Sequence, residues 1–442
     1  MTHECVFPGR SLVLGRLVLA AAAITVSSAS TAWGWGAGHR FVTEGAMAAL
    51  PQWQKDLLGK ELALLGSQHC FIPDLVYAKK EVRKYAMMDS KPDKFYLVEL
   101  HLPPAPTESY EILRYFMAKA VEQFKAARVD EGARYLGTLS HALEDWGAPA
   151  HSVPGDNMFT LMKQFVPPTD EYRYLPMHSP MEGGTFTVDL GDYKPRLLGG
   201  TVEEAAFNLL HRVQQSTIHA RAQVIPIMRA LYAKDDAASN AAQQKAGHVD
   251  AEVVADAVYT VLCLGQSRFE PPAIEPLTRV DLSQRITLET PTLAWPQSAF
   301  FSKPYWGHPT RGVSMRGGKQ AVAIRVKAAD DALGDKPIED AVAVGTKTTL
   351  TYLVPPGVYD RLEVWAALHA ELGAGGNVIF EIKGADGKTL AKVQVQGDQP
   401  AQRMTAPLAG QSTVQLITTT GSADSTHNYA VWARPQLVKA EK

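Results

Sequence analysis

The chain has 442 residues, with 44 basic and 46 acidic side chains, so its formal net charge is only −2. This balance gives no overall positive charge to attract a polyanion, so it argues against a nuclease, although a local basic patch can still bind DNA. Three cysteines are few for this length, so side-chain packing rather than disulfide bonds must hold the core together.

The N-terminal segment, residues 1–32, has the pattern of a cleaved export signal. Two arginines precede an apolar run over residues 17–26 that is too short to span a bilayer, and small residues follow it. Cleavage after Ala32 would make Trp33 the new terminus, whereas cleavage after Gly34 would expose Trp35. No later segment has the length and apolar character of a membrane helix. We therefore expect an exported, soluble protein, either secreted or periplasmic.

Helical periodicity dominates residues 33–268, which predicts an all-α domain. A long segment between His151 and Tyr193 contains proline and glycine, as is typical of a loop that shapes a site. The predicted helices are residues 108–128, 130–145, 201–233 and 249–264.

The end of the second predicted helix, residues 130–145, has the pattern of a metal site. His141 and Asp145 are four residues apart, so on a helix they project from one face. A glycine and a proline then break the helix, and His151 follows in the turn. Two imidazoles and a carboxylate suit a divalent ion such as zinc. The alternative is an amphipathic helix whose His141 is a hydrogen-bonded histidine of the protein core. Glu144 points away from the face that carries His141 and Asp145, and we expect it to be exposed to solvent.

The composition changes near Phe269, and we place a linker at residues 269–290. Beyond it, short strand-like runs alternate with glycine, aspartate and proline, which predicts an all-β sandwich over residues 291–442. The fold class is therefore multidomain, all-α followed by all-β. The predicted strands include residues 321–326, 348–354, 361–367, 377–382 and 413–418.

The order of candidate ligands over residues 33–270 resembles the zinc-dependent bacterial phospholipases C, whose fold the fungal single-strand nucleases share. Those enzymes hold three zinc ions with an N-terminal tryptophan, five histidines and acidic residues. An α-amino group has a pKa near 8, so a metal displaces its proton at little cost. The residues that match in order are Trp33, His39, Asp74, His141, Asp145, His151, His178 and Glu182.

Two departures from the family pattern concern the remaining ligands. The family has a histidine between the early aspartate and the helical pair, where this chain has Lys94, and a charged lysine does not readily ligate. His101 is the candidate for this ligand, and a loop histidine that caps the next helix is the alternative. Two glycines follow Glu182 where the family continues a helix, so a third metal would be weakly held if Glu182 is not a ligand. His69 is expected to line a loop, and His211 is expected to be structural or exposed.

The resemblance implies hydrolysis of a phosphodiester. Clustered zinc ions neutralise phosphate oxygens and lower the pKa of a bound water. In that scheme Asp74 serves as ligand and general base, and Asp145 bridges two ions. Water would attack the phosphorus of a phospholipid such as phosphatidylcholine, releasing diacylglycerol and the phosphorylated headgroup at a membrane or micelle surface.

The C-terminal part resembles the carbohydrate-binding sandwich appended to some glycosidases, in residues 359–364, 376–382 and 427–437. This resemblance implies a carbohydrate partner. Trp432 either stacks on a sugar or packs in the core. Toxin-type phospholipases append a calcium-binding sandwich instead, but the acidic loop clusters that calcium needs are missing here, so no calcium is predicted.

Two alternatives to the phospholipase remain open. The first keeps the metals and takes single-stranded nucleic acid as substrate, although nucleic acid is not the first choice of partner. The second is a surface glycan-binding protein with a structural metal core. We expect a monomer. Cys70 and Cys263 remain after cleavage, an even number that could pair in an oxidising compartment.

Overall fold

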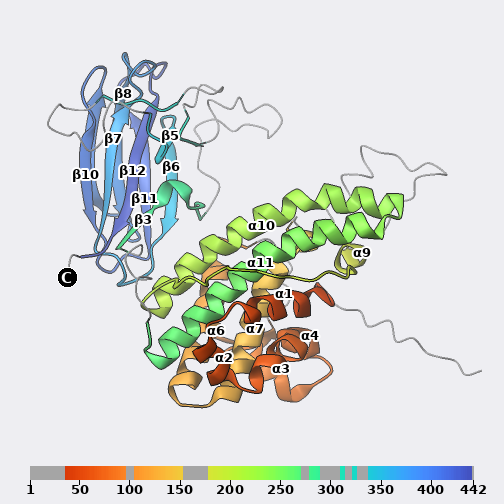
Figure 1. Ribbon diagram of the computed structural model, residues 1–442. Coiled ribbons are helices and arrows are strands. Elements are labelled where there is room, and N and C mark those ends of the chain that lie inside the picture. The colour runs from red at the N-terminus through yellow and green to blue at the C-terminus, as the bar shows by residue number, and fades with distance from the viewer. Residues whose placement is uncertain are drawn as a thin grey trace, which may run out of the picture. The chain divides into compact units, whose positions relative to one another are not determined.

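The computed structural model describes residues 35–95, 104–152, 178–269, 278–288, 309–313, 321–325 and 337–440 (Figure 1). The N-terminal part of this range is helical and the C-terminal part is built of β-strands, which confirms the predicted fold class. Among the helices that are described, none is long and apolar enough to cross a membrane.

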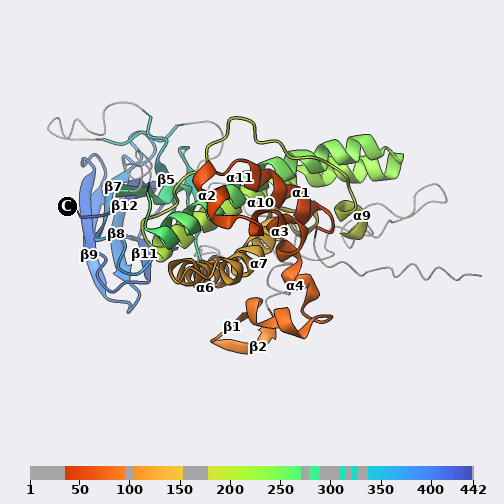
Figure 2. The same cartoon turned by 60° about the horizontal axis from the view of Figure 1, so that its bottom comes forward.

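Short elements open the helical part. Pro51 precedes the second helix and Gly59, at a φ of 52°, ends it, so these helices stay short. The hairpin β1–β2 extends beyond α4 in Figure 2. In chain order they are α1 (Gly38–Ala48), α2 (Gln52–Leu58), α3 (Glu61–Ser67), η1 (His69–Phe71), α4 (Ile72–Leu75), η2 (Lys80–Tyr85), β1 (Met87–Met88) and β2 (Lys91–Phe95).

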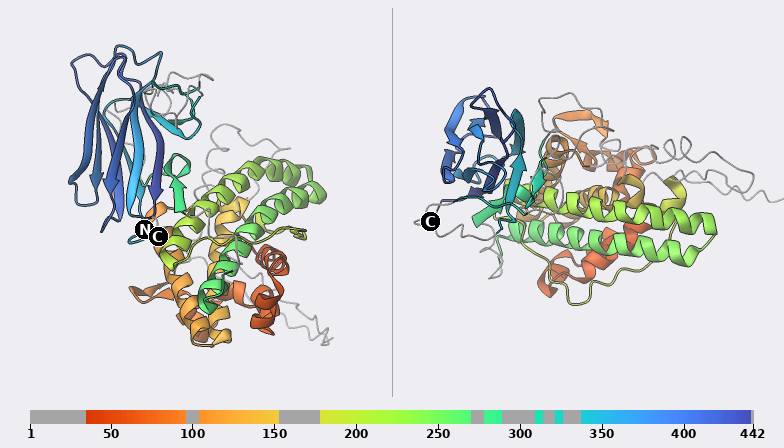
Figure 3. Two further views of the ribbon diagram at one scale, coloured as in Figure 1. Left: turned by 60° about the vertical axis from the view of Figure 1, so that its left-hand side comes forward. Right: turned by 90° about the horizontal axis from the view of Figure 1, so that it is seen from above.

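Four long helices form the bulk of the helical part, each overlapping one that periodicity predicts. They are α6 (Pro106–Lys125), α7 (Val129–Gly147), α10 (Val202–Ala233) and α11 (Asp236–Gln266). The side chain of Thr201 accepts a hydrogen bond from the backbone N–H of Glu204, and Asp235 does the same for Ala238, so both later helices have N-caps. α10 and α11 run side by side in Figures 1 and 3.

The chain between α7 and α10 includes two short helical turns. η3 (Pro149–His151) follows α7 at once, because Pro149 starts a new turn that returns the chain towards α7. α9 (His178–Glu182) contacts η3, and residues 183–200 follow without a helix or strand.

The β-strands that follow the helical part form two antiparallel sheets that face each other (Figure 3). One has the order β10-β7-β12-β5-β4, with β3 paired to β12, and the other has the order β6-β11-β8-β9. The bounds are β3 (Arg279–Asp281), β4 (Thr310–Arg311), β5 (Ala341–Val344), β6 (Thr348–Leu353), β7 (Arg361–Leu368), β8 (Asn377–Gly384), β9 (Thr389–Gln396), β10 (Gln402–Pro407), β11 (Thr413–Thr420) and β12 (Ala430–Val438).

The core of the sandwich contains Trp432. Its indole is fully buried and meets the ring of Phe380 edge-on, with centroids 4.9 Å apart, so it joins β12 of one sheet to β8 of the other. Of the two roles that the sequence allows for Trp432, the structure therefore supports packing in the core and excludes stacking on a sugar.

Two details differ from the sequence-based expectation, and a third answers a question that the sequence leaves open. β3 lies inside the segment predicted as a linker and pairs with β12, so the sheet begins before residue 291. The predicted strand at residues 321–326 forms only isolated bridges within its described part. Cys70 and Cys263 are both buried and form no disulfide bond with each other, and the Cys70 thiol donates to the carbonyl of Gly66.

Candidate metal centre

Five elements of the helical part bring acidic and imidazole side chains to one place. α1 carries His39 in its first turn, α4 carries Asp74, and α7 carries His141 and Asp145 one turn apart. η3 supplies His151 and α9 ends on Glu182. Apart from Asp74, which is partly exposed, all of these side chains are buried.

Asp145 lies at the centre of this group. Its Oδ1 is 3.5 Å from Nε2 of His39 and 3.7 Å from Nε2 of His151, and its Oδ2 is 3.2 Å from Nε2 of His141. One carboxylate therefore faces three imidazoles from two sides. This is the arrangement expected of a carboxylate that bridges two ions, and the same three nitrogens are available as ligands.

The other carboxylates approach the same imidazoles. Asp74 Oδ1 is 4.0 Å from Nε2 of His141, and Glu182 Oε1 is 3.1 Å from Nε2 of His151. Within the described residues, His39, Asp74 and His141 each offer one ligand atom, and these atoms lie within 4.8 Å of one another.

The atoms of this cluster fit a divalent cation. Asp74 Oδ1 and His141 Nε2 are buried and make no hydrogen bond, although buried polar atoms normally find a partner. Imidazole nitrogens and carboxylate oxygens are the donors that zinc takes in proteins. A cation at this place would satisfy atoms that the protein leaves unsatisfied, so the donor set fits zinc.

The backbone nitrogen of Trp35 also belongs to this site. Its N–H donates to Nε2 of His39 over 2.9 Å. The Trp35 indole is fully buried and lies against Gly38, whose missing side chain makes the room, and its ring centroid is 5.6 Å from that of Phe186. Trp33, the predicted terminal ligand, lies outside the described residues. Trp35, the other candidate terminus, is the one whose nitrogen is found beside His39.

Hydrogen bonds on the far side of the rings fix two of the histidines. Nδ1 of His141 donates to the carbonyl of Cys70 over 2.7 Å. Nδ1 of His39 is 2.8 Å from Oε2 of Glu144. The expectation that Glu144 points into solvent is wrong: its side chain is fully buried, because α1 covers that face of α7.

The charges of the cluster stabilise one another. Burial raises the pKa of Asp145, but the neighbouring His141 and His151 outweigh it and hold that pKa well below its usual range. Burial lowers the pKa of His141, and the carboxylates of Asp145 and Asp74 raise it to about 10. Burial raises the pKa of Asp74. Asp145 therefore stays charged, as a metal ligand must, while Asp74 is the carboxylate more ready to take up a proton.

The remaining candidate residues are placed as follows. His178 is the first residue of α9, and nothing of its side chain is described. His101 lies outside the described residues. Nε2 of His69 is 2.8 Å from Oε2 of Glu61, away from the cluster, and burial lowers the pKa of His211 to about 3. Within the described residues, neither of these histidines joins the ligand cluster.

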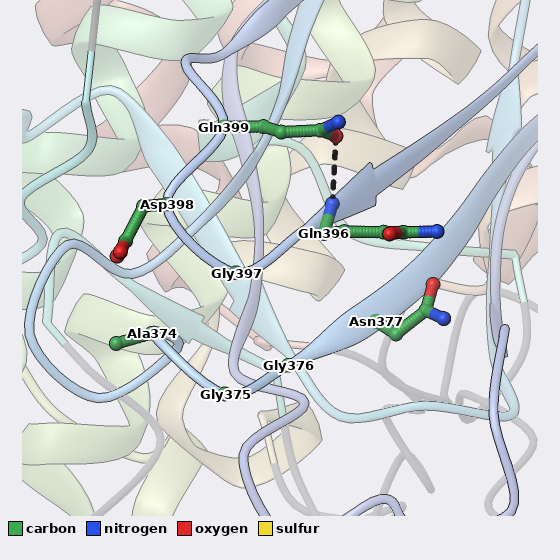
Figure 4. Close-up of a pocket in the computed structure, with 8 residues that line it drawn as sticks. All are labelled: Ala374, Gly375, Gly376, Asn377, Gln396, Gly397, Asp398 and Gln399. Atoms are coloured by element: carbon green, nitrogen blue, oxygen red, sulfur yellow. Dashed lines mark hydrogen bonds between the residues drawn. The ribbon is translucent and has the colours of Figure 1, made fainter.

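A second feature, on the sandwich, is a shallow polar depression (Figure 4). Asn377 at the start of β8 and Gln396 at the end of β9 line it, together with Asp398 and Gln399 in the turn that follows. The Gln399 side chain accepts from the backbone N–H of Gln396 over 2.9 Å, which holds this turn. Glycines at residues 375, 376 and 397 also line it.

Comparison with known proteins gives one family match. Residues 314–438 match the family model of the NPCBM/NEW2 domain, which confirms the resemblance of the C-terminal part. No curated protein matches the chain.

Solved structures of two kinds are similar to this chain. Alpha toxin from Clostridium absonum is 12% identical over 92% of this chain and 99% of its own, with a TM-score of 0.34. The CBM51 of Clostridium perfringens GH95, in complex with methyl-galactose, is 15% identical over 36% of this chain and 100% of its own, with a TM-score of 0.30. CBM51-2, in complex with GlcNAc, and INT domains of Clostridium perfringens ZmpB are 13% identical over 36% of this chain, with a TM-score of 0.30, and the match spans 31% of that ZmpB chain.

Proposed function

We propose that this protein is an exported, zinc-dependent phosphodiester hydrolase that cleaves phospholipids as a phospholipase C. The observation that carries the proposal is the position of Asp145, whose two oxygens face the Nε2 atoms of three buried histidines. Three zinc ions are expected from the resemblance, and the cluster around Asp145 supports at least a site of this donor type.

The ligand set we propose begins at the new N-terminus. Two nitrogen ligands of one tetrahedral zinc ion, each bound at about 2.0–2.1 Å, lie roughly 3.3–3.4 Å apart. The backbone nitrogen of Trp35 is 2.9 Å from Nε2 of His39, which is about half an ångström closer, so a small movement would let both nitrogens bind one ion. We therefore infer that cleavage after Gly34 leaves Trp35, not Trp33, as the terminal ligand. The other ligands are His39, Asp74, His141, Asp145, His151 and Glu182, with His178 and His101 completing the set as the resemblance implies.

Maturation is tested by the sequence of the exported chain. N-terminal sequencing should give Trp35 first. A variant with one extra residue before Trp35 keeps that nitrogen in a peptide bond, whose lone pair is delocalised, so it should bind less zinc. Trp33 as the first residue, with full zinc content, would overturn this assignment.

Bound zinc would polarise a phosphate oxygen and lower the pKa of a water towards neutrality. The chain's own contribution is to place carboxylates where they serve this chemistry. Asp145 holds its negative charge among three imidazoles. Asp74 is the partly exposed carboxylate of the cluster, so it is the one placed to accept a proton from water.

The substrate is tested by a parallel assay of the mature protein on phosphatidylcholine micelles, single-stranded DNA and a chromogenic phosphodiester. Phospholipase C activity requires diacylglycerol and phosphocholine from the micelles, loss of both with a chelator, and recovery with zinc. Turnover of DNA alone would make the protein a nuclease. Zinc binding without turnover of any substrate would favour a glycan-binding protein whose metal core is structural.

For the sandwich we propose carbohydrate binding, on the basis of the family match at residues 314–438. Trp432 is buried and unavailable for stacking on a sugar, so we assign the recognition to hydrogen-bonding side chains. The depression lined by Asn377, Gln396 and Asp398 offers amide and carboxylate groups that suit sugar hydroxyls (Figure 4). Titration of the full chain with methyl-galactoside and with GlcNAc tests this, and Asn377→Ala should weaken whichever binds.

A further inference from the structure

Glu144 has no role of its own in the proposed hydrolysis, but it forms a buried pair with His39, one of the proposed zinc ligands. Both side chains are fully buried, and Oε2 of Glu144 is 2.8 Å from Nδ1 of His39. They lie 105 residues apart in the chain, so the contact depends on the packing of α1 against α7.

The hydrogen bonds of His39 assign its tautomer. Nε2 accepts the N–H of Trp35, so this nitrogen carries a lone pair. Nδ1 must then carry the hydrogen and donate it to Glu144, because a neutral imidazole has one donor and one acceptor. The lone pair of Nε2 therefore points to the Trp35 N–H, and Asp145 Oδ1 lies 3.5 Å from the same nitrogen, in the ligand cluster.

A second residue fixes Glu144 itself. The hydroxyl of Thr43 donates to Oε1 of Glu144, and Thr43 is also fully buried. His39 and Thr43 lie one turn apart on α1, so one helix holds both oxygens of the carboxylate. The His39 ring is further held by stacking on His141, with centroids 4.2 Å apart and an angle of 16° between the rings.

We propose that Glu144 is a positioning residue for zinc binding: it holds His39 in the Nδ1–H tautomer, with Nε2 presented to the ion, and Thr43 holds Glu144. This inference rests on the proposed zinc centre. Partners of this kind raise the basicity of the ligating nitrogen, and their loss lowers metal affinity by about 10- to 100-fold.

The chain contains a matched control. Glu61 and His69 form another buried pair, also with 2.8 Å between the carboxylate oxygen and the ring nitrogen. His69 is not among the described residues whose ligand atoms cluster. Glu61→Gln therefore makes the same chemical change in an equally buried pair that holds no ligand.

The experiment compares zinc affinity in the mature full-length wild type, Glu144→Gln and Glu61→Gln, by competition with a chromophoric chelator. Nitrogen NMR of the labelled histidine rings reports the His39 tautomer in the same samples. We expect Glu144→Gln to bind zinc about 10- to 100-fold more weakly, with a mixed tautomer at His39, and Glu61→Gln to stay within about twofold of the wild type. Thr43→Val should weaken binding less, in the same direction, and replaces Glu144→Gln if that variant does not fold.

The outcomes separate this inference from the proposed function. A wild type that binds no zinc overturns the metal centre itself. A wild type that binds zinc, together with a Glu144→Gln protein of equal affinity and unchanged tautomer, overturns only the role of Glu144. Equal losses in Glu144→Gln and Glu61→Gln would likewise overturn it, because they would mean that any buried glutamate matters for stability alone.

Discussion

At the scale of single residues, Asp145 is the side chain on which the most contacts of the centre depend. Asp145→Asn keeps the size but removes the charge and puts an N–H among three imidazole nitrogens. We expect zinc to be lost and phosphodiester turnover to fall by more than about 100-fold, since even a residue behind a ligand is worth 10- to 100-fold. Metal analysis and a turnover assay on the same preparation measure both effects.

The control for that prediction is His211→Ala. His211 lies on α10, outside the ligand cluster, and burial keeps its imidazole neutral. Activity should stay within about twofold of the wild type. Equal losses in the two variants would show that the ligand assignment is wrong.

Single residues also show what the sequence predicts and what it misses. The spacing of His141 and Asp145 predicts a shared helix face, and the structure brings His39, Asp74 and His151 to that face. Glu144 is misjudged because a helical wheel considers one helix at a time. Its environment depends on α1, more than 100 residues earlier in the chain. A signal existed: between Leu136 and Ala150, the only acidic side chain besides that of the proposed ligand Asp145 is that of Glu144.

At the scale of elements, the centre depends on how closely η1 approaches α7. Gly137 on α7 is the contact point: a Cβ built there would lie 2.4 Å from the backbone of His69. The next residue of η1, Cys70, gives its carbonyl to Nδ1 of His141. Separating η1 from α7 therefore affects both the packing and the orientation of a proposed ligand.

We accordingly expect Gly137→Ala to lower the free energy of unfolding by about 1–3 kcal/mol, the usual cost of overpacking. Zinc affinity should fall with it, because His141 loses its fixed acceptor. Denaturant unfolding of the zinc-free and zinc-loaded forms measures the two effects.

Gly200→Ala is the matched control for this change. A Cβ at Gly200 would meet only the Glu204 carboxylate, at 3.9 Å, so stability and zinc affinity should barely change. A Gly137→Ala protein as stable as the Gly200→Ala protein would show that η1 moves without cost.

Helices and strands whose apolar residues recur at a regular spacing are predicted from the sequence, and those without such a spacing are missed. Four long helices follow from apolar periodicity, but the first half of α11 is rich in alanine and glutamine and has no apolar stripe, so its start at Asp236 is missed. Strands β7 and β8 alternate buried and partly buried residues, as their sequences predict. The run at residues 321–326 alternates equally well, yet it forms only bridges, because pairing depends on the neighbouring chain.

At the scale of the whole molecule, zinc should contribute to folding stability. An ion that binds only the folded chain stabilises it by about 2.7 kcal/mol when free zinc is 100 times the dissociation constant. We expect the unfolding temperature to rise with free zinc and to fall with a chelator, as measured by calorimetry. Asp145→Asn should show no such dependence. An unfolding temperature of the wild type that does not change with the zinc concentration would contradict the proposed metal centre.

The sequence also predicts the organisation of the molecule, helices first and a sandwich second, because the two parts differ in periodicity throughout. It places the boundary wrongly. β3 is only three residues long, and it pairs with β12, more than 150 residues later in the chain. The sequence around β3 cannot indicate a partner so far away.

The proposed use of the Trp35 amine as a metal ligand matters for the cell that makes this protein. On the proposed processing, the amine beside His39 exists only after the leader has been removed. The newly synthesised precursor would lack one metal donor while it is still among the producer's own lipids. Proteolysis would then delay the lipid-degrading activity until the protein has crossed the membrane of the cell that makes it.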